Sequence, residues 1–194
     1  MKAFKSLVYL LLFLCTTLLS MMLLSSQPML ADSLSSANSI KLTSVNHIGI
    51  PVRNLDRSLK FYRELTGGTV LFADNPMYGE GLSKGTKVAN ASLRFGMLKV
   101  DNTILELIEY ENPKGKDFDR LNNDIGSIHI AFEVPNIQAV YEQLKAQGVE
   151  FNAPPYTFTE EDGAPDIVGA TFAYFKDPDG IQLEIFEPAK SKSL

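Results

Sequence analysis

Cysteine is almost absent from this chain of 194 residues. The single example, Cys15, lies in an apolar N-terminal run. The rest of the chain can therefore form no disulfide and can supply no thiolate ligand to a metal. About 150 residues follow that run, which is enough for one hydrophobic core. Stability must come from this core and from any metal that the protein binds.

Runs of basic residues are also lacking. The formal net charge is −5, and no cluster of lysine and arginine follows the N-terminal region. This charge pattern disfavours nucleic acid as a partner. Histidine is equally scarce, with only two in the chain. Their positions lead to most of the predictions below.

The N-terminus has the pattern of an export signal. Lys2 and Lys5 precede an apolar run at 7–24, and small and polar residues follow it. We predict that residues 1–31 form a signal peptide, that 32–41 form a flexible leader, and that the mature protein is exported to the periplasm or secreted. The alternative is an uncleaved anchor in which 7–24 tethers the protein to the membrane, because about 18 apolar residues can just span a bilayer.

Both histidines open the same short phrase. The first phrase is HIGIPV at 47–52, and the second is HIAFEV at 129–134. Each is followed by a helix pattern, and each half ends in a strand pattern with a central glutamate, LEL at 105–107 and LEI at 183–185. Agreement in order, helix start, helix end and final glutamate indicates a duplication.

The local patterns predict the elements of each half. The first half has strands at 43–52, 69–73, 89–97 and 103–111, with a helix that starts after Asn54 and stops at Gly67; the second has strands at 127–134, 149–152, 170–176 and 181–187, with a helix that starts after Asn136 and stops at Gly148. We therefore predict an α+β domain at 42–190, built from two β-α-β-β-β modules at 43–111 and 126–188. Three longer loops, at 75–88, 112–125 and 154–168, either cover a site or are surface loops with no role in it.

Strand alternation places the candidate chemistry. Successive strand residues face opposite sides, so His47 shares a face with Gly49, and His129 shares one with Ala131. These small residues leave space beside each imidazole. Glu106 and Glu184 each lie between apolar neighbours, and a buried, unpaired carboxylate is costly. A divalent cation bound by both histidines and both glutamates resolves that cost, whereas Glu109, Glu133 and Glu187 are interpreted as edge residues that face solvent.

These motifs resemble the vicinal oxygen chelate superfamily, which includes glyoxalase I, bleomycin-resistance proteins, extradiol dioxygenases and methylmalonyl-CoA epimerases. The resemblance spans about 44–188 and is carried by HIGI at 47–50, LEL at 105–107, IHIAFEV at 128–134 and DPDGIQLE at 177–184. It implies a cupped, eight-stranded half-barrel around a metal and a homodimer. It places the metal ligands at His47, Glu106, His129 and Glu184, and mixed nitrogen and oxygen ligands suit Ni, Co, Zn, Fe or Mn.

The resemblance implies a glyoxalase-like lyase or isomerase that acts on a small oxygenated substrate chelated at the metal. Glu184 or Glu106 would then move the proton. Alternation places Tyr110, Gln182 and Phe186 on the metal-facing side, where we predict that they contact the substrate. The alternatives are a non-catalytic binding or resistance protein, which typically lacks the ligands, and an extradiol-type dioxygenase, which normally uses three.

Two departures from glyoxalase I concern glutathione. Pro51 stands where that enzyme has an arginine, four positions after the first histidine. Tyr110 stands where it has an asparagine, four positions after the first glutamate. Both departures, together with the predicted export, disfavour a glutathione or coenzyme A thioester as the substrate.

Overall fold

The structure, a computed structural model, describes residues 42–117 and 119–190. The predicted signal peptide and leader, at 1–41, lie outside the described residues. Within the described ranges, no helix is long and apolar enough to cross a membrane.

The described chain repeats one order of elements. The first half contains β1 (Ile48–Pro51), α3 (Leu55–Thr66), β2 (Thr69–Tyr78), α4 (Glu80–Thr86), β3 (Ser92–Val100) and β4 (Thr103–Asn112). The second half contains β5 (His129–Glu133), α5 (Ile137–Ala146), β6 (Tyr156–Thr157), the 3-10 turns η1 (Glu160–Asp162) and η2 (Pro165–Ile167), β7 (Thr171–Lys176) and β8 (Gln182–Glu187). The predicted α+β class and the two β-α-β-β-β modules are confirmed.

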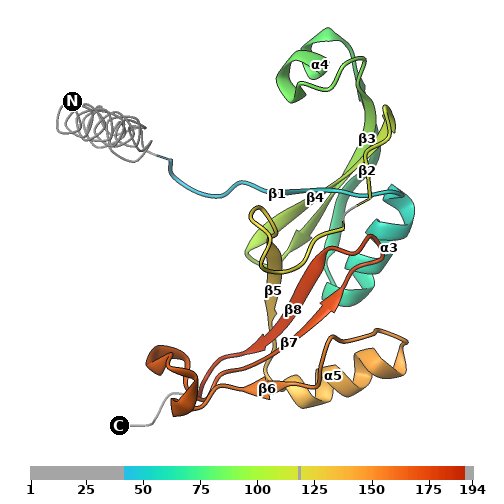
Figure 1. The fold of residues 1–194 in the computed structure, drawn as a ribbon. Helices are drawn as coiled ribbons and strands as arrows, with labels where there is room; N and C mark the ends of the chain where they lie inside the picture. Colours follow the sequence, from blue (N-terminus) through green and yellow to red (C-terminus); the bar gives the residue numbers. More distant parts are fainter. Residues whose placement is uncertain (1–41, 118, 191–194) are drawn as a thin grey trace, which may run out of the picture. The chain divides into compact units, whose positions relative to one another are not determined.

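Each module forms its own four-stranded sheet (Figure 1). The strand orders are β1-β4-β3-β2 and β5-β8-β7-β6. In both sheets the first strand pairs in parallel with the last, and the remaining pairs are antiparallel. The eight strands are therefore arranged as two open sheets. In each sheet the His-bearing phrase lies beside the Glu-bearing strand.

The helix boundaries follow the capping residues of the sequence. The side chain of Asn54 accepts a hydrogen bond from the N–H of Arg57, and Asn136 does the same for Ala139. At the other end of α3, Gly67 adopts the left-handed conformation, with φ 68°. Gly148, just after α5, also has a positive φ, 89°. Asparagine supplies the missing acceptor at the start of a helix, and glycine allows the left-handed exit without strain.

Two glutamates tie the helices to the sheets, and the sequence interpretation of them was wrong. Glu109 and Glu187 were expected to face solvent. Instead, Oε2 of Glu109 accepts a hydrogen bond of 2.8 Å from the N–H of Leu55, the first residue of α3. Oε2 of Glu187 accepts an equal bond from Ile137, the first residue of α5. A carboxylate at a helix N-terminus also interacts favourably with the helix dipole.

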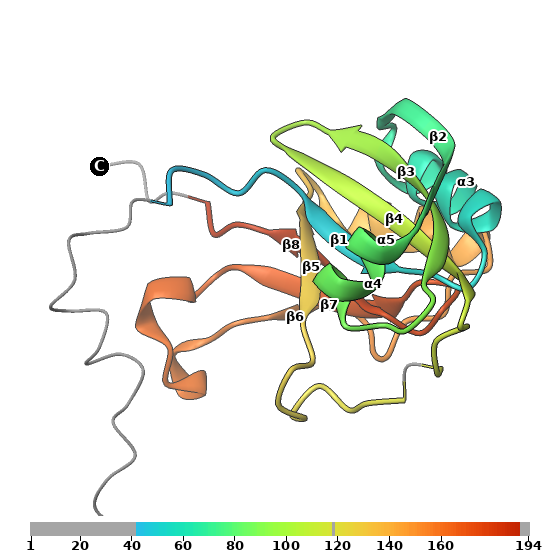
Figure 2. The ribbon, with the colours of Figure 1, turned by 90° about the horizontal axis from the view of Figure 1, so that it is seen from above.

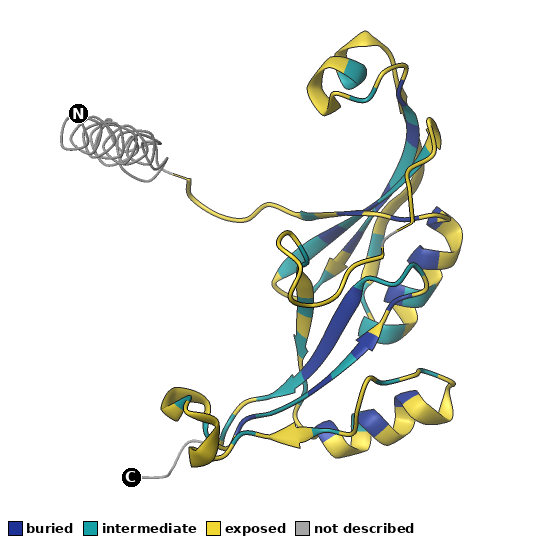
Figure 3. Ribbon diagram, in the orientation of Figure 1, coloured by how far each residue is buried: buried dark blue, intermediate teal, exposed yellow. Residues whose placement is uncertain are grey.

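One hydrophobic core contains residues of both modules, and Figure 3 shows buried residues on the strands and on α3 and α5. The compact unit that contains both modules starts at Val45. Fully buried leucines occupy matching places in the two sheets, because Leu105 pairs with Ile48 and Leu183 pairs with Ile130. The modules are therefore not independent folding units.

A polar contact joins α3 of the first module to the β7–β8 turn of the second. The buried hydroxyl of Tyr62 donates a 3.0 Å hydrogen bond to Asp177. The other oxygen of Asp177 accepts from the N–H groups of Asp179 and Ile181, which closes the turn. Burial raises the pKa of Asp177, and these hydrogen bonds act against that rise.

Three segments differ from their predictions. The strand predicted at 43–52 is shorter, because β1 starts only at Ile48 and His47 lies just before it. The strand expected at 149–152 is reduced to one bridge, between Phe151 and Phe175, and the paired strand β6 begins only at Tyr156. In the first module, β2 continues to Tyr78, and the predicted loop at 75–88 contains the short helix α4. None of the residues of α4 is buried. Apolar periodicity could therefore not have revealed this helix.

Candidate functional site

The first candidate pair consists of His47, just before β1, and Glu106 on β4. The register places Gly49 opposite Glu106, and Nε2 of His47 lies 3.2 Å from Oε2 of Glu106. A Cβ on Gly49 would lie 3.5 Å from the same carboxylate oxygen, so the glycine leaves space beside it. Nδ1 of His47 lies 2.9 Å from Oδ1 of Asn46. When Nδ1 donates to that amide, Nε2 is left as the free ligand atom.

The second pair repeats this arrangement on β5 and β8. Ala131 lies opposite Glu184, and Nε2 of His129 lies 3.0 Å from Oε2 of Glu184. Glu184 is more deeply buried than Glu106, with side chains 9% and 18% exposed. Burial raises the pKa of the Glu184 carboxyl, while His129 and the hydroxyl of Tyr174 act to lower it.

The two pairs are not brought together into a single cluster. Among residues 42–117 and 119–190, no group of three or more His, Cys, Asp or Glu side chains is close enough to hold one metal ion. The four predicted ligands thus lie as two His–Glu pairs, one on each sheet, and we call each pair a half-site. Parity along a strand predicts which residues share a face, but it does not predict how two sheets face each other.

Each half-site nevertheless fits a divalent ion. Imidazole nitrogen and carboxylate oxygen bind such ions at about 2.0–2.2 Å. Adjacent ligand atoms at right angles around one ion therefore lie about 3 Å apart. The observed separations of 3.2 Å and 3.0 Å match this spacing. Each half-site supplies two ligands, so a four-ligand site requires both.

The three predicted substrate-contact residues have different surroundings. Tyr110 lines a pocket next to the first half-site. Phe186 lies opposite Phe172 in the neighbouring strand and is partly buried. Gln182 is buried, and its amide nitrogen donates to the carbonyl oxygens of Phe175 and Leu183. These bonds hold Gln182 to the backbone, and its role toward a substrate stays a prediction.

A tyrosine that sequence reasoning missed lies beside the second half-site. Tyr174 is opposite Glu184 in the β7–β8 pair, and its ring meets the imidazole of His129 edge-on at 5.3 Å between centroids. Burial, followed by the charge and hydrogen bond of Glu184, raises the pKa of the Tyr174 hydroxyl. Counting back across the turn at 177–180 would have found this partner.

Further aromatic rings extend from Tyr174 along β7 and β6. Tyr174 contacts Phe172, which stacks on Phe158 at 5.0 Å, and Tyr156 contacts both phenylalanines. We call Tyr156, Phe158, Phe172 and Tyr174 the aromatic wall. Its rings are partly buried or exposed, and no comparable series is recorded in the described part of the first module. The second half-site is therefore flanked by a large apolar surface.

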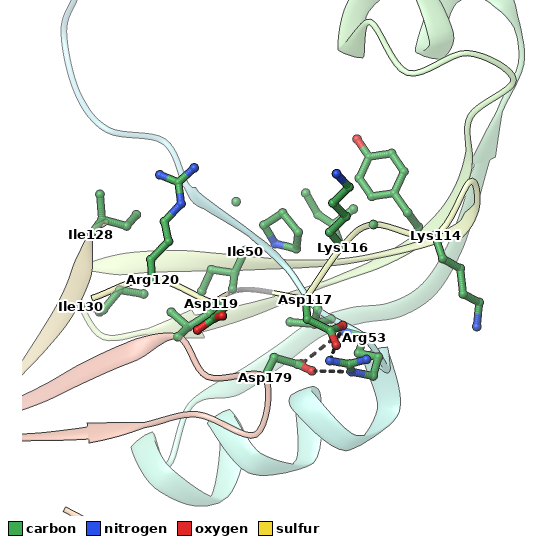
Figure 4. Close-up of a pocket in the computed structure, with 17 residues that line it drawn as sticks. Ile50, Arg53, Lys114, Lys116, Asp117, Asp119, Arg120, Ile128, Ile130 and Asp179 are labelled. Carbon is green, nitrogen blue, oxygen red and sulfur yellow. Dashed lines mark hydrogen bonds and ion pairs between the residues drawn. The ribbon is translucent and has the colours of Figure 1, made fainter. Parts of the chain in front are cut away.

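A pocket of about 550 Å³ adjoins the first half-site (Figure 4). One side of the pocket is formed by β1 and β4 and includes Gly49, Pro51, Ile108 and Tyr110. Another is formed by the connection from β4 to β5, which Figure 2 shows in yellow. Of the three long loops noted in the sequence, only this one, predicted at 112–125, contributes to the pocket.

An ion-pair cluster forms the floor of the pocket where the modules meet. Arg53 contacts Asp117 at 2.6 Å and Asp179 at 3.6 Å, as Figure 4 shows. Arg57 also contacts Asp179, at 2.5 Å. Burial acts to raise the pKa of Asp179, but its hydrogen bonds and charged partners outweigh burial and lower it. Asp179 therefore remains ionised and holds both arginines.

Tandem β-α-β-β-β modules that form two open sheets, each with a His–Glu pair, are typical of vicinal oxygen chelate proteins. The family model for the Glyoxalase/Bleomycin resistance protein/Dioxygenase superfamily matches residues 44–185. The chain belongs to this superfamily, and the predicted resemblance to vicinal oxygen chelate proteins is confirmed.

Known relatives cover most of the chain. It is 34% identical over 146 residues to 2-epi-5-epi-valiolone epimerase from Actinomyces sp., covering 73% of this chain and 78% of the relative. It is 28% identical over 153 residues to lactoylglutathione lyase from Haemophilus influenzae, covering 76% and 94%. Among solved structures, a glyoxalase family protein from Bacillus cereus has a TM-score of 0.66 at 18% identity, covering 80% of this chain and all of that one.

Proposed function

We propose that the protein is a metal-dependent, glyoxalase-like lyase or isomerase in which His47, Glu106, His129 and Glu184 together hold one divalent ion. The observation that carries this proposal is the repeated His–Glu pair, with the same atoms at 3.2 Å and 3.0 Å in both modules. The mixed nitrogen and oxygen ligands suit Ni, Co, Zn, Fe or Mn.

The separation of the half-sites supports an assembly from two copies of the chain. We propose that the first half-site of one copy meets the second half-site of another. In a homodimer with twofold symmetry, this arrangement makes two equivalent four-ligand sites. It also accounts for the lack of a three-residue cluster within the described part of one chain.

The chemistry divides between the ion and the side chains. The ion, when bound, supplies positive charge that makes the carbon next to a coordinated carbonyl more acidic. Glu184, the carboxylate of the second half-site, takes the proton from that carbon, and Tyr174 lies opposite it. In one outcome, a protonated Glu106 gives its own proton to the opposite face of the same carbon, which leaves Glu106 ionised and Glu184 protonated. In the other, Glu184 gives the proton that it took to the neighbouring carbon. The first outcome is an epimerisation, and the second is a glyoxalase-type isomerisation.

The relatives support this reaction class, since one is named an epimerase and the other a lyase. The first substrates to test are therefore 2-epi-5-epi-valiolone and a mixture of methylglyoxal with glutathione. Pro51 and Tyr110 disfavour the glutathione compound. Tyr110, at the pocket, is proposed to donate a hydrogen bond to the substrate, and Phe186 to exclude water. Export through residues 1–31 is part of the proposal and would place the reaction outside the cytoplasm.

Elemental analysis of the full chain tests the metal site. The wild type should contain a divalent ion, and both His47→Ala and His129→Ala should lose it. Glu133→Gln is the control, because Glu133 is an exposed carboxylate on the same strand as His129. Glu184→Gln should keep the fold and lower turnover by about a hundredfold or more, since an amide cannot act as the base. Unchanged metal content in both histidine variants would reject the site.

A further inference from the structure

The connection between β4 and β5 places positive side chains above an apolar surface. Lys114, Lys116 and Arg120 from this connection line the pocket. In Figure 4, Lys116 and Arg120 project to the same side, above Ile50, whereas Lys114 points away. The apolar lining comes from β1, β4, β5 and residues that adjoin the strands, and includes Ile50, Pro51, Val52, Ile108, Ile128 and Ile130.

The charges that line the pocket are unevenly neutralised. Arg53 is held by Asp117 and Asp179. Within the described ranges, no ion pair is recorded for Lys116 or Arg120. Nη1 of Arg120 donates to the carbonyl oxygen of Ile125 at 2.9 Å, which orients the guanidinium and leaves its other N–H groups free for a ligand. Asp119 also lines the pocket, so the lining as a whole has four positive side chains and three carboxylates, against a net charge of −5 for the whole chain.

We propose that this pocket binds a small organic anion, with its apolar body on Ile50, Pro51 and Ile108 and its carboxylate or phosphate held by Lys116 and Arg120. The volume of about 550 Å³ lies within the usual range for small-molecule sites, roughly 300–1,000 Å³. Arginine and lysine both suit such anions, and arginine can hold them through two parallel hydrogen bonds.

The pocket adjoins the proposed reaction centre. Gly49 lines the pocket and lies opposite Glu106, and a Cβ on Gly49 would lie 3.5 Å from Oε2 of Glu106. A ligand in the pocket would therefore reach the first half-site. The inference builds on the proposed function by giving its substrate an anionic group, but anion binding can be measured without metal and without turnover. Failure of anion binding can thus be distinguished from failure of the proposed metal-dependent activity.

The test uses two fluorescent probes with similar apolar bodies and different charge, in the metal-free full chain. One is the anion 8-anilinonaphthalene-1-sulfonate, and the other is the neutral N-phenyl-1-naphthylamine. The double variant Lys116→Gln, Arg120→Gln should bind the anionic probe at least about tenfold more weakly, because it loses two charge-assisted contacts. Its affinity for the neutral probe should stay within about twofold of the wild type.

The matched control is Lys60→Gln, Arg63→Gln, which removes the same two residue types from the exposed side of α3. This variant should bind both probes like the wild type. Benzoate and phenyl phosphate are then added as competitors, and displacement of the anionic probe by one of them identifies which anion the pocket prefers. The proposal is overturned if neither competitor displaces the anionic probe, or if both double variants bind that probe equally weakly. It is also overturned if the pocket variant loses as much affinity for the neutral probe as for the anionic one.

Discussion

The module at 45–112 and the module at 127–188 hold their helices in the same way. An asparagine caps each helix, and a glutamate from the last strand accepts the first N–H of the helix. On the opposite face of each sheet, a histidine and a glutamate lie 3.0–3.2 Å apart. The two modules therefore share both the contacts that build the fold and the contacts that define a half-site.

The modules differ in what surrounds the half-site. Opposite Glu106 lies Met97, whereas opposite Glu184 lies Tyr174. The first half-site opens onto a pocket with positive side chains, and the second is flanked by the aromatic wall. The repeated ligands can serve one common centre, while the different surroundings can contact different parts of one substrate.

The largest effect on stability is expected from equivalent core leucines. Leu105→Ala and Leu183→Ala should each lower the free energy of unfolding by about 2–5 kcal/mol, because each removes a fully buried side chain and leaves a cavity. Both should shift one common transition in denaturant, monitored by circular dichroism, since the two modules share a core. Leu121→Ala, at a side chain that is 71% exposed, is the control. Two separate transitions, each sensitive to one variant, would show that the modules fold independently.

A smaller loss of stability is expected from one of two buried helix tyrosines, and almost none from the other. Tyr62→Phe in α3 removes the donor to buried Asp177 and should cost about 1.5–3 kcal/mol. Tyr141→Phe in α5 should change stability by less than about 0.5 kcal/mol. No hydrogen bond is recorded for the Tyr141 hydroxyl in the part of the chain that the structure describes. Equal losses of stability in the two variants would contradict a specific role for the Tyr62 hydrogen bond.

The Tyr62 effect should also depend on pH. Burial raises the pKa of Asp177, and the Tyr62 hydrogen bond acts to lower it. Loss of that bond raises the folded-state pKa further, so it penalises the ionised carboxyl more than the protonated one. The deficit of Tyr62→Phe should therefore be largest at neutral pH and should shrink as the pH falls through the pKa of Asp177. Denaturant unfolding at several pH values measures this, and a constant deficit would contradict it.

Much of the fold could be predicted because its signals are local. Asn54, Gly67 and Asn136 mark helix ends through local chemistry, and alternation places each histidine on the same face as the small residue two positions later. The failures have non-local causes. Glu109 and Glu187 accept hydrogen bonds from helix starts that lie about fifty residues away in the chain. The strand pattern at 149–152 ends before Pro154 and Pro155, and the pairing moves to Tyr156.

The candidate site was predicted in its parts and not in its assembly. The sequence indicates His47 with Glu106 and His129 with Glu184, and the structure brings each pair together. It does not indicate whether the two pairs meet within one chain, because that depends on how two whole sheets pack. The pocket residues Lys116 and Arg120 were also missed, since a connecting loop has no periodicity that reveals which way its side chains point.

The central claim is that one metal site is made from the first half-site of one copy and the second half-site of another. Full-length His47→Ala and His129→Ala chains should be unfolded together, refolded as a mixture, and analysed for bound metal. Each variant alone should contain none. In the mixture, half of the dimers combine the two variants, and one of their two sites has all four ligands. The account predicts about a quarter of the wild-type metal content, and a mixture as empty as the separate variants would contradict it.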